Sequence, residues 1–316
     1  MRLAKTILVR LLFGVLSLLF ISFVVFIADE LAPGDAATIQ LGDKATPEKL
    51  ARTRADLGLD RPWPVRYIEF VGKASHLDFG KSYFGTREEV WTTIGRTLPM
   101  TVRIAIFAIL LASAVGILLG TIAGIYQNRF ADRSVLVVST LGVTLPNFVL
   151  IPVLVLIFAV YLNYLPTTWE VTRVAPDFYY LLLPVIVLAA RPMATLTRLT
   201  RASMIDTLDQ EFIRLAVAKG VPSFRLYVRH ALRNAILPVV TAIGTSFGFL
   251  LTGSFVVETA FTLPGLGYTT INAIQQGDTP LIEATVIITG ALFIVVNLLV
   301  DLTLPFLDPR IRESQV

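Results

Sequence analysis

Six long stretches without a charged residue constrain this sequence more than any other feature. An α-helix needs about 20 mainly apolar residues to cross the hydrocarbon core of a bilayer. The uncharged runs cover residues 11–28, 104–126, 134–169, 178–190, 235–257 and 284–300. The run at 178–190 is the shortest, and it can extend toward residue 196 if Arg191 snorkels to the interface. We therefore predict about six transmembrane helices.

The composition excludes a soluble globular protein. Hydrophobic residues make up 55% of the chain and charged residues only 16%, and the mean hydropathy is +0.72. An average soluble domain carries about 25% charged residues. The chain has no Cys and only two His, which argues against disulfides, thiolate metal sites and His-rich metal sites. We expect an all-α integral membrane protein, embedded in a lipid bilayer, that binds no metal and no nucleic acid.

The distribution of charge predicts which ends of the helices lie in the cytoplasm. With six spans, both termini lie on the same side of the membrane. If that side is the inside, the inner segments carry 15 basic and 6 acidic residues, a net charge of +9. The outer segments then carry 12 basic and 16 acidic residues, a net charge of −4. Because basic residues favour the cytoplasmic side, we expect both termini in the cytoplasm.

This topology divides the chain into four parts. Residues 1–28 form an N-terminal transmembrane anchor, because the uncharged run is longer than the 7–15 residues of a signal-peptide core and lacks a clear A-x-A site. Residues 29–97 form an extracytoplasmic loop region, in which the apolar spacing at 65–71 predicts a short helix. The remaining parts are a transmembrane core at 98–307, with a cytoplasmic loop at 191–234, and a cytoplasmic tail at 308–316.

Small residues recur at intervals of four in the second and fifth predicted spans. Residues four apart share one face of a helix, and small residues let membrane helices approach closely. The residues concerned are Ala108, Ala112, Gly116, Gly120 and Gly124 in the second span, and Gly244 and Gly248 in the fifth. We predict that both faces are helix-packing seams.

The third predicted span is interrupted by Pro146, Asn147 and Pro152. A broken membrane helix is tolerated where its freed carbonyl groups meet protein or a water-filled cavity. Pro146 and Asn147 are therefore candidates for the translocation pathway, and an ordinary proline kink is the alternative. Because the uncharged runs contain no ionisable side chain, a proton relay or a voltage sensor is disfavoured.

The sequence offers no catalytic constellation. Gly80-Lys81-Ser82 resembles the end of a phosphate-binding loop, but Ser75 stands where the pattern requires glycine. No nucleophile and base occur in a recognisable arrangement. We therefore expect a protein that is not an enzyme and that binds no cofactor, ATP included.

Residues 207–220, in the predicted cytoplasmic loop, have the periodicity of an amphipathic helix. Leu208, Phe212, Leu215 and Ala216 fall on one face of this predicted helix. Asp209 and Glu211 occupy the predicted first turn, and Lys219 and Gly220 the end, as the helix dipole and glycine termination favour. The segment is either a helix lying on the membrane surface or a docking element for a partner.

The same segment carries a motif. Arg214-Leu215-Ala216, followed after three residues by Gly220, resembles the EAA loop of ABC-importer permeases, whose coupling helix contacts the ATPase. Arg214 stands where the general family has Glu, and Leu215 stands where it has the first Ala. With these two substitutions the motif resembles that of the "B" subunit in the peptide-permease branch. This branch includes dipeptide, oligopeptide, nickel and glutathione importers. Further segments similar to that branch are 57–62, 78–82, 218–220, 230–234, 264–267 and 308–310.

This resemblance implies a type I ABC importer permease fold in a multi-pass protein of the bacterial inner membrane. It implies four partners: a homologous second permease, two ATPase subunits that bind and hydrolyse ATP, and an extracytoplasmic solute-binding protein. It also implies a pathway for peptides or similar small solutes. The residues that it assigns to ATPase coupling are Asp209, Glu211, Phe212, Arg214, Leu215, Ala216, Lys219 and Gly220. The alternatives are an ATP-independent secondary transporter or channel, and a scaffolding protein.

The predicted topology can be tested with introduced cysteines, because the chain has none of its own. We expect Thr46→Cys and Asn272→Cys to react with a membrane-impermeant thiol reagent added to sealed cells. Ser223→Cys, in the inner loop, should react only after the membrane is permeabilised. Reaction of Ser223→Cys in sealed cells would contradict the six-span topology.

Overall fold

The computed structural model describes residues 2–31, 36–42, 45–84, 87–169 and 176–307, so the predicted tail at 308–316 and the motif at 308–310 lie outside it. The described residues are helical, and they contain no β-strand beyond one isolated antiparallel bridge between Lys81 and Glu89. Five helical segments are long and apolar enough to span a membrane, and a bent pair of helices brings the number to six. The prediction of an all-α membrane protein with about six spans is confirmed.

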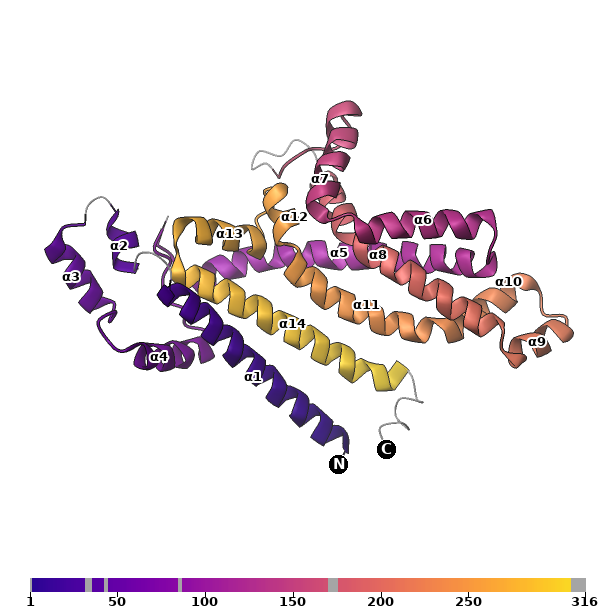
Figure 1. Ribbon diagram of the computed structural model, residues 1–316, viewed down its shortest axis with the longest axis horizontal. Helices are drawn as coiled ribbons and strands as arrows, with labels where there is room; N and C mark the ends of the chain where they lie inside the picture. Colours follow the sequence, from indigo (N-terminus) through magenta and orange to yellow (C-terminus); the bar gives the residue numbers. More distant parts are fainter. Residues whose placement is uncertain (1, 32–35, 43–44, 85–86, 170–175, 308–316) are drawn as a thin grey trace. The chain divides into compact units, whose positions relative to one another are not determined.

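The chain forms two compact units, one of which combines Met1–Thr101 with Leu263–Ile294. It contains α1 (Arg2–Leu31), α2 (Ala36–Leu41), α3 (Pro47–Asp56), α4 (Trp63–Ser75), α13 (Leu266–Gln276) and the first parts of α5 (Val90–Ile125) and α14 (Thr279–Leu307) (Figure 1). Its core brings together Phe79, Val90, Ile94, Leu266, Ala273, Leu281 and Ala284.

Helix α4 confirms the short helix that the spacing at 65–71 predicts, and aromatic side chains attach it to α1. The ring of Tyr67 meets those of Phe23 and Phe26 with centroids 5.5 and 5.4 Å apart. The Tyr67 hydroxyl donates a hydrogen bond to the carbonyl oxygen of Leu19 (3.1 Å). The amphipathic ring and its polar hydroxyl thus anchor the predicted outer region to the end of the first span.

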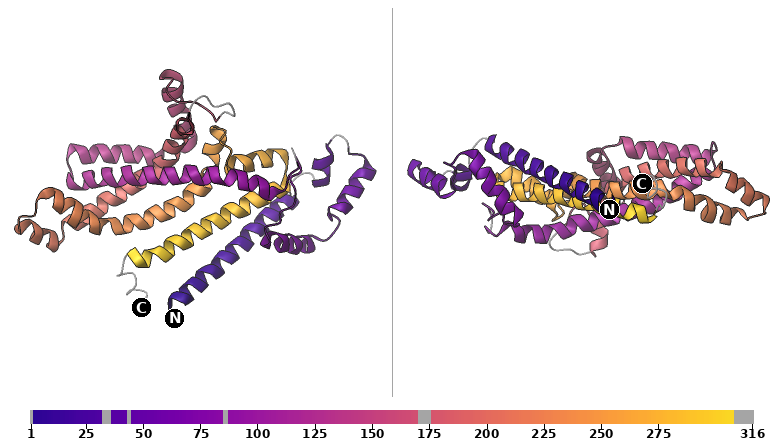
Figure 2. Two further views of the ribbon diagram at one scale, coloured as in Figure 1. Left: turned by 180° about the vertical axis from the view of Figure 1, so that it is seen from behind. Right: turned by 90° about the horizontal axis from the view of Figure 1, so that it is seen from below.

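The second unit combines Val102–Thr262 with Val295–Val316, and α8 is its central helix. Its elements are the remaining parts of α5 and α14 together with α6 (Phe130–Thr144), α7 (Asn147–Val155), the π-helix η2 (Leu156–Tyr161), α8 (Asp177–Leu208), α9 (Glu211–Ala218), α10 (Ser223–Arg225), the π-helix η3 (Leu226–Leu232), α11 (Arg233–Gly253) and α12 (Phe255–Ala260). Helix α8 runs between α6 and α11 and contacts both (Figure 1), and Figure 2 shows the arrangement from two further sides.

The helices do not match the uncharged runs in extent, and the differences are largest at the runs 178–190 and 134–169. The run at 178–190 belongs to α8, which continues without a break to Leu208. Its length exceeds the uncharged run because helix hydrogen bonds do not require apolar side chains, and packing against α6 and α11 supports the polar half. The run at 134–169 is not one tilted helix, because α6 and the α7–η2 segment are bent by 110°.

The small-residue seam of α5 packs against the backbone of α8. A Cβ atom added at Gly116 would lie 3.0 Å from the Met193 carbonyl oxygen, and one at Gly124 would lie 2.6 Å from Met204 Cβ. At Gly120 it would lie 2.5 Å from the carbonyl oxygen of Thr197. The predicted seam is therefore the contact surface between two helices whose backbones nearly touch.

The shorter seam of α11 is also a packing surface. A Cβ atom added at Gly244 would overlap the side chain of Val300 on α14, and Gly248 is buried. Gly244 thus occupies a position where a larger side chain has no room.

Gly120→Ala should destabilise the protein by roughly 1–3 kcal/mol, because even one methyl group would force α5 and α8 apart. Gly95→Ala is the matched control on the same helix, since a Cβ atom there meets nothing within 4 Å. The control should be neutral or mildly stabilising, as alanine is the better helix former. Thermal unfolding of the detergent-solubilised variants measures both effects. Equal melting temperatures for the two variants would show that close packing at Gly120 does not contribute to stability.

Candidate translocation cavity and coupling loop

The bend between α6 and α7 falls at Leu145 and Pro146. Pro146 takes the extended conformation (φ −66°, ψ 151°), and its carbonyl oxygen accepts the N–H groups of Val149 and Leu150 at 3.0 and 3.1 Å. Proline cannot donate the hydrogen bond that would continue α6. The chain therefore turns at Pro146 and starts a new helix at Asn147.

Asn147 borders a cavity of about 500 Å³ in the second unit. The other walls come from α8 and from the C-terminal half of α11, and most of their polar groups are hydroxyls. The lining residues are Asn147, Leu188, Arg191, Pro192, Thr195, Ala242, Thr245, Ser246, Phe249, Leu250, Thr252 and Gly253. Pro146 itself does not line the cavity, so its place is at the bend and not at the wall.

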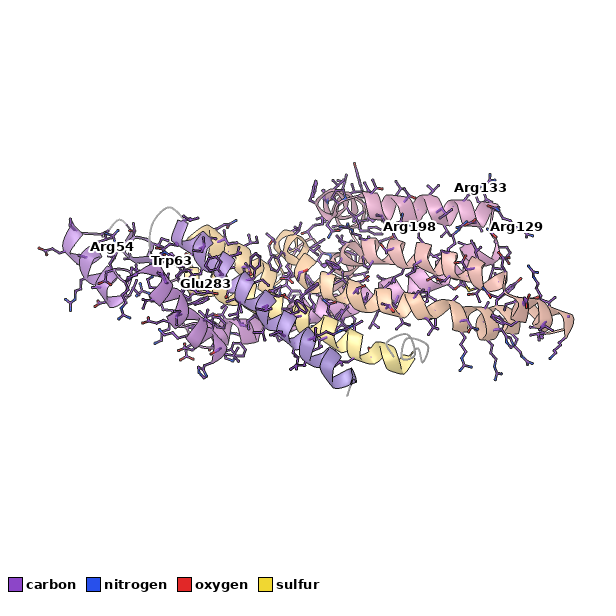
Figure 3. All side chains as sticks on the ribbon, turned by 60° about the horizontal axis from the view of Figure 1, so that its bottom comes forward. Arg54, Trp63, Arg129, Arg133, Arg198 and Glu283 are labelled. Atoms are coloured by element: carbon purple, nitrogen blue, oxygen red, sulfur yellow. The ribbon has the colours of Figure 1, made fainter. Side chains whose placement is uncertain are left out.

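The predicted uncharged runs contain no ionisable side chain, but the helices that include them extend past the runs and carry charged residues there. Arg191 lies near the middle of α8, Glu283 (Figure 3) lies on α14, and Asp132 is buried on α6. Asp132 and Glu283 lie near the first residues of their helices, whereas Arg191, next to the predicted run at 178–190, is enclosed in a longer helix.

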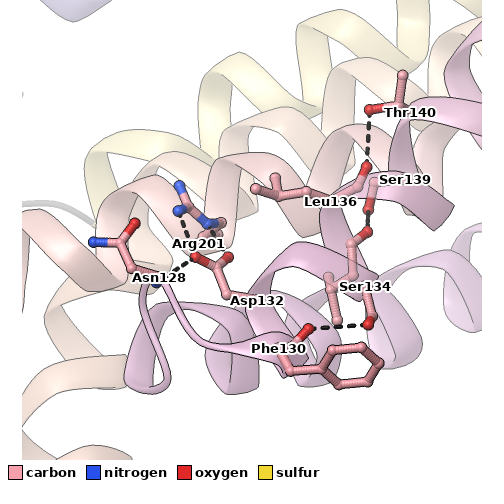
Figure 4. Close-up of polar contacts among 9 residues, drawn as sticks. Asn128, Phe130, Asp132, Ser134, Leu136, Ser139, Thr140 and Arg201 are labelled. Atoms are coloured by element: carbon pink, nitrogen blue, oxygen red, sulfur yellow. Dashed lines mark hydrogen bonds and ion pairs between the residues drawn. The ribbon is translucent and has the colours of Figure 1, made fainter.

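Asp132 forms a buried ion pair that joins α6 to α8 (Figure 4). Arg201 donates from Nε to one carboxylate oxygen of Asp132 at 2.5 Å and from a terminal nitrogen to the other at 2.8 Å. The backbone N–H of Asn128 donates to the same carboxylate at 2.8 Å. The Asp132 side chain is only 2% exposed, so its charge is compensated by hydrogen bonds and not by water.

The loop after α8 is broken where the sequence predicts one helix. Helix α8 ends at Leu208 with Asp209 as its C-cap, Gln210 is extended (φ −71°, ψ 150°), and α9 begins at Glu211. Asp209 is therefore not in the first turn of the coupling helix, and the predicted single helix over 207–220 is wrong. The negative charge of Asp209 is unfavourable at the C-terminal end of α8, where the helix dipole is negative. The negative charge of Glu211 is favourable in the first turn of α9, where the dipole is positive.

The break turns α9 so that a different face is buried. Ile213 is 4% exposed and, together with the partly buried Ala216, packs on a cluster formed by Met204, Leu226, Ala231 and Ala235. Phe212 and Leu215 are 41% and 61% exposed. The predicted grouping of Leu208, Phe212, Leu215 and Ala216 on one face is wrong, since Leu208 and Ala216 face the cluster.

The end of α9 is as the sequence predicts. Gly220 has φ +75°, and its N–H donates to the carbonyl oxygen of Val217 at 2.9 Å. The N–H of Val221 reaches back to the carbonyl oxygen of Ala216 at 3.1 Å, which closes a glycine-terminated helix end. Lys219 is the C-cap, and Glu211, Arg214 and Lys219 are exposed.

In the first unit, Asp278 holds the segment that follows the predicted short outer helix. Its buried carboxylate accepts the Ser82 hydroxyl and, at 3.1 Å, the N–H of Tyr83. Burial raises the pKa of the Tyr83 phenol above its ordinary value. The segment at 78–82 is thus fixed by a polar clamp, and no phosphate-binding role is needed to explain it.

Comparison with known proteins identifies the family of this chain. The family model for the binding-protein-dependent transport system inner membrane component matches residues 116–313. The model for the N-terminal part of such membrane components matches residues 3–105. The chain belongs to this permease family.

Two relatives cover nearly the whole length. The "Probable peptide ABC transporter permease protein" of Sinorhizobium fredii (strain NBRC 101917 / NGR234) is 34% identical over 306 residues, which are 96% of this chain and 97% of that protein. The glutathione transport system permease protein GsiC of Salmonella typhi is 36% identical over 306 residues, again 96% of this chain and 97% of that protein.

This chain is accordingly a permease subunit of a binding-protein-dependent ABC importer. The family decides between the importer and the alternatives that the sequence left open, a secondary transporter or channel and a scaffold. It is a multi-pass membrane protein of a transporter complex, and it has the all-α fold of a type I ABC permease.

Asp132→Asn in this permease should lower the free energy of unfolding by about 3–5 kcal/mol, because it leaves the charge of Arg201 without its buried partner. Asp132→Leu combined with Arg201→Met should recover part of that loss, since no unpaired charge remains.

Glu69→Gln is the control, because the Arg61–Glu69 pair is about half exposed on both sides and should contribute at most about 1 kcal/mol. Thermal unfolding in detergent distinguishes the variants. A loss at Glu69→Gln as large as at Asp132→Asn would contradict the assignment.

Proposed function

We propose that this permease forms one half of a pathway that carries peptides or similar small solutes across the bacterial inner membrane. In this proposal it works with a homologous second permease, two ATPase subunits and an extracytoplasmic solute-binding protein. ATP is bound and hydrolysed on the ATPase subunits, so this chain is not an enzyme and binds no cofactor. The names of the peptide and glutathione permeases that it resembles support the solute class.

The observation that carries the proposal is the exposed apolar pair Phe212 and Leu215 on α9. Their helix is closed at its C-terminal end by Lys219 and Gly220 and is anchored through Ile213 and Ala216, so Phe212 and Leu215 project from a fixed element. Two large apolar groups on a short, charged helix are suited to fill a groove in a protein partner. We assign them, with Arg214 beside them, to the contact with an ATPase subunit.

The structure around α9 offers a physical route from this contact to the cavity. The cluster beneath α9 includes Met204 of α8 and Ala235 of α11. The same two helices form most of the cavity wall. A movement of the ATPase subunit that shifts α9 would therefore move α8 and α11 together, and ATP would change the relative populations of outward- and inward-open states.

The topology follows the positive-inside pattern in this proposal. Both termini and the part of the 191–234 loop that follows α8 lie in the cytoplasm, where the ATPase subunits are. The 29–97 region lies outside, where α3, α4 and the clamped segment at 78–82 are available to meet the solute-binding protein.

The double variant Phe212→Ala/Leu215→Ala tests the coupling contact. It should abolish co-purification of the ATPase subunits and solute-stimulated ATP hydrolysis, whereas the melting temperature of the isolated permease should stay the same. These side chains are exposed, so their removal opens no cavity.

Ile213→Ala on the same helix is the matched comparison. It removes a buried side chain and should cost roughly 2–5 kcal/mol of stability. If the double variant still binds and couples to the ATPase subunits as wild type does, the assignment of α9 is wrong.

A further inference from the structure

The second half of α8 carries a polar exposed stripe. Its exposed positions are spaced four, three, four and four residues apart, which places them on one helix face. They are Arg191, Thr195, Arg198 (Figure 3), Ala202 and Asp206. This face of α8 is therefore charged and hydroxylated over several turns.

Other spanning helices expose a different kind of surface. Among the described residues of α1 and α5, the large exposed side chains in the spans are mostly apolar, as lipid contact requires. They are Leu12, Phe13, Leu16 and Phe20 on α1, and Ile106, Phe107, Leu110 and Leu118 on α5. Charged side chains within membrane helices face a protein interior or a water-filled cavity. Arg191 and Thr195, which lie within about 20 residues of the start of α8, consequently do not face lipid.

Arg191, at the beginning of this stripe, lines the cavity that Asn147 also borders. Within the described part of the chain, its side chain forms neither an ion pair nor a hydrogen bond. The lining residues include no carboxylate, and hydroxyl groups of Thr195, Thr245 and Ser246 surround the same space. The Thr195 and Thr245 hydroxyls donate to the backbone carbonyl oxygens of Arg191 and Ala242, so the guanidinium of Arg191 is the group of this cavity best suited to bind an anion.

We propose that Arg191 binds a carboxylate of the transported solute as it passes this cavity. A guanidinium group matches a carboxylate with two parallel hydrogen bonds, and every peptide with a free C-terminus carries such a group. The inference rests on the proposed function, because it requires solute to pass along this face of α8. It adds a specificity-determining residue within the membrane to the selection made by the solute-binding protein.

Uptake into vesicles containing the complete reconstituted transporter tests the inference. The experiment compares two tripeptides, both of which the solute-binding protein delivers. One has a free C-terminal carboxylate and the other has a C-terminal amide. Arg191→Gln should lower the ratio of acid to amide uptake by about tenfold relative to wild type, the equivalent of one charge-assisted hydrogen bond. Because the binding protein is unchanged, its own preference cancels in this comparison.

Two further variants are matched to this one. Arg191→Lys keeps the positive charge and should retain most of the ratio. Arg198→Gln removes a charge from the same exposed face of α8 but outside the cavity lining, and it should leave the ratio unchanged. A ratio unaltered in Arg191→Gln overturns the inference, and so does an equal loss of acid and amide uptake, which would indicate a pairing of Arg191 with the second permease.

A measurement that needs no transport uses Thr195→Cys, since Thr195 lines the same cavity and the chain has no other Cys. Anionic and cationic methanethiosulfonates of similar size label this cysteine, and intact mass spectrometry of this chain gives the two rates. The anionic reagent should react faster, and adding Arg191→Gln, but not Arg198→Gln, should reduce that preference about tenfold. Equal preferences with and without Arg191 overturn the inference.

The two proposals fail in distinguishable ways. If the wild-type complex hydrolyses ATP but imports neither tripeptide, the proposed function fails. If it imports both and Arg191→Gln leaves the ratio and the labelling preference as they were, only the role of Arg191 fails.

Discussion

The contact between the backbones of α5 and α8 governs the arrangement of the second unit. Gly116, Gly120 and Gly124 let α8 approach so closely that an added methyl group would meet backbone atoms of Thr197 or side-chain atoms of Met204. Lipid provides no hydrophobic drive for helices to associate, so such contacts must supply the attraction by dispersion. With one side of α8 fixed against α5, its other sides are available for α6, for α11 and for the cavity.

Charged groups on α8 follow from this position. Arg201 reaches away from α5 to the buried carboxylate of Asp132, which secures α6 and the turn before it. Arg191 points to the cavity instead, where an unpaired guanidinium must be hydrated or meet an anion. One helix thus carries an arginine that is paired with a buried carboxylate and another that borders a cavity, and the packing of Asp132 against Arg201 makes the difference.

The loop after α8 packs against the two helices that form most of the cavity wall, as the proposed coupling requires. Burial of Ile213 and Ala216 makes α9 part of the same cluster as Met204 and Ala235. Helices transmit displacement along their axes because interiors are closely packed and deform little. A rigid α8 and α11 therefore connect the exposed pair Phe212 and Leu215 to the cavity walls, and the break at Gln210 permits this docking.

The sequence by itself determined the features that depend on local composition and spacing. Uncharged runs revealed the spans because unpaired polar groups are excluded from hydrocarbon, the small-residue intervals revealed the α5 seam, and Gly220 marked the end of α9.

Tertiary structure decided the rest. The break at Asp209 and Gln210 and the inward face of Ala216 depend on the cluster against which α9 packs. The pairing of Asp132 with Arg201, and the opening of Arg191 onto a cavity, join residues far apart in the chain. Spacing along one helix cannot show which distant side chain will neutralise a charge, because that depends on how the helices pack.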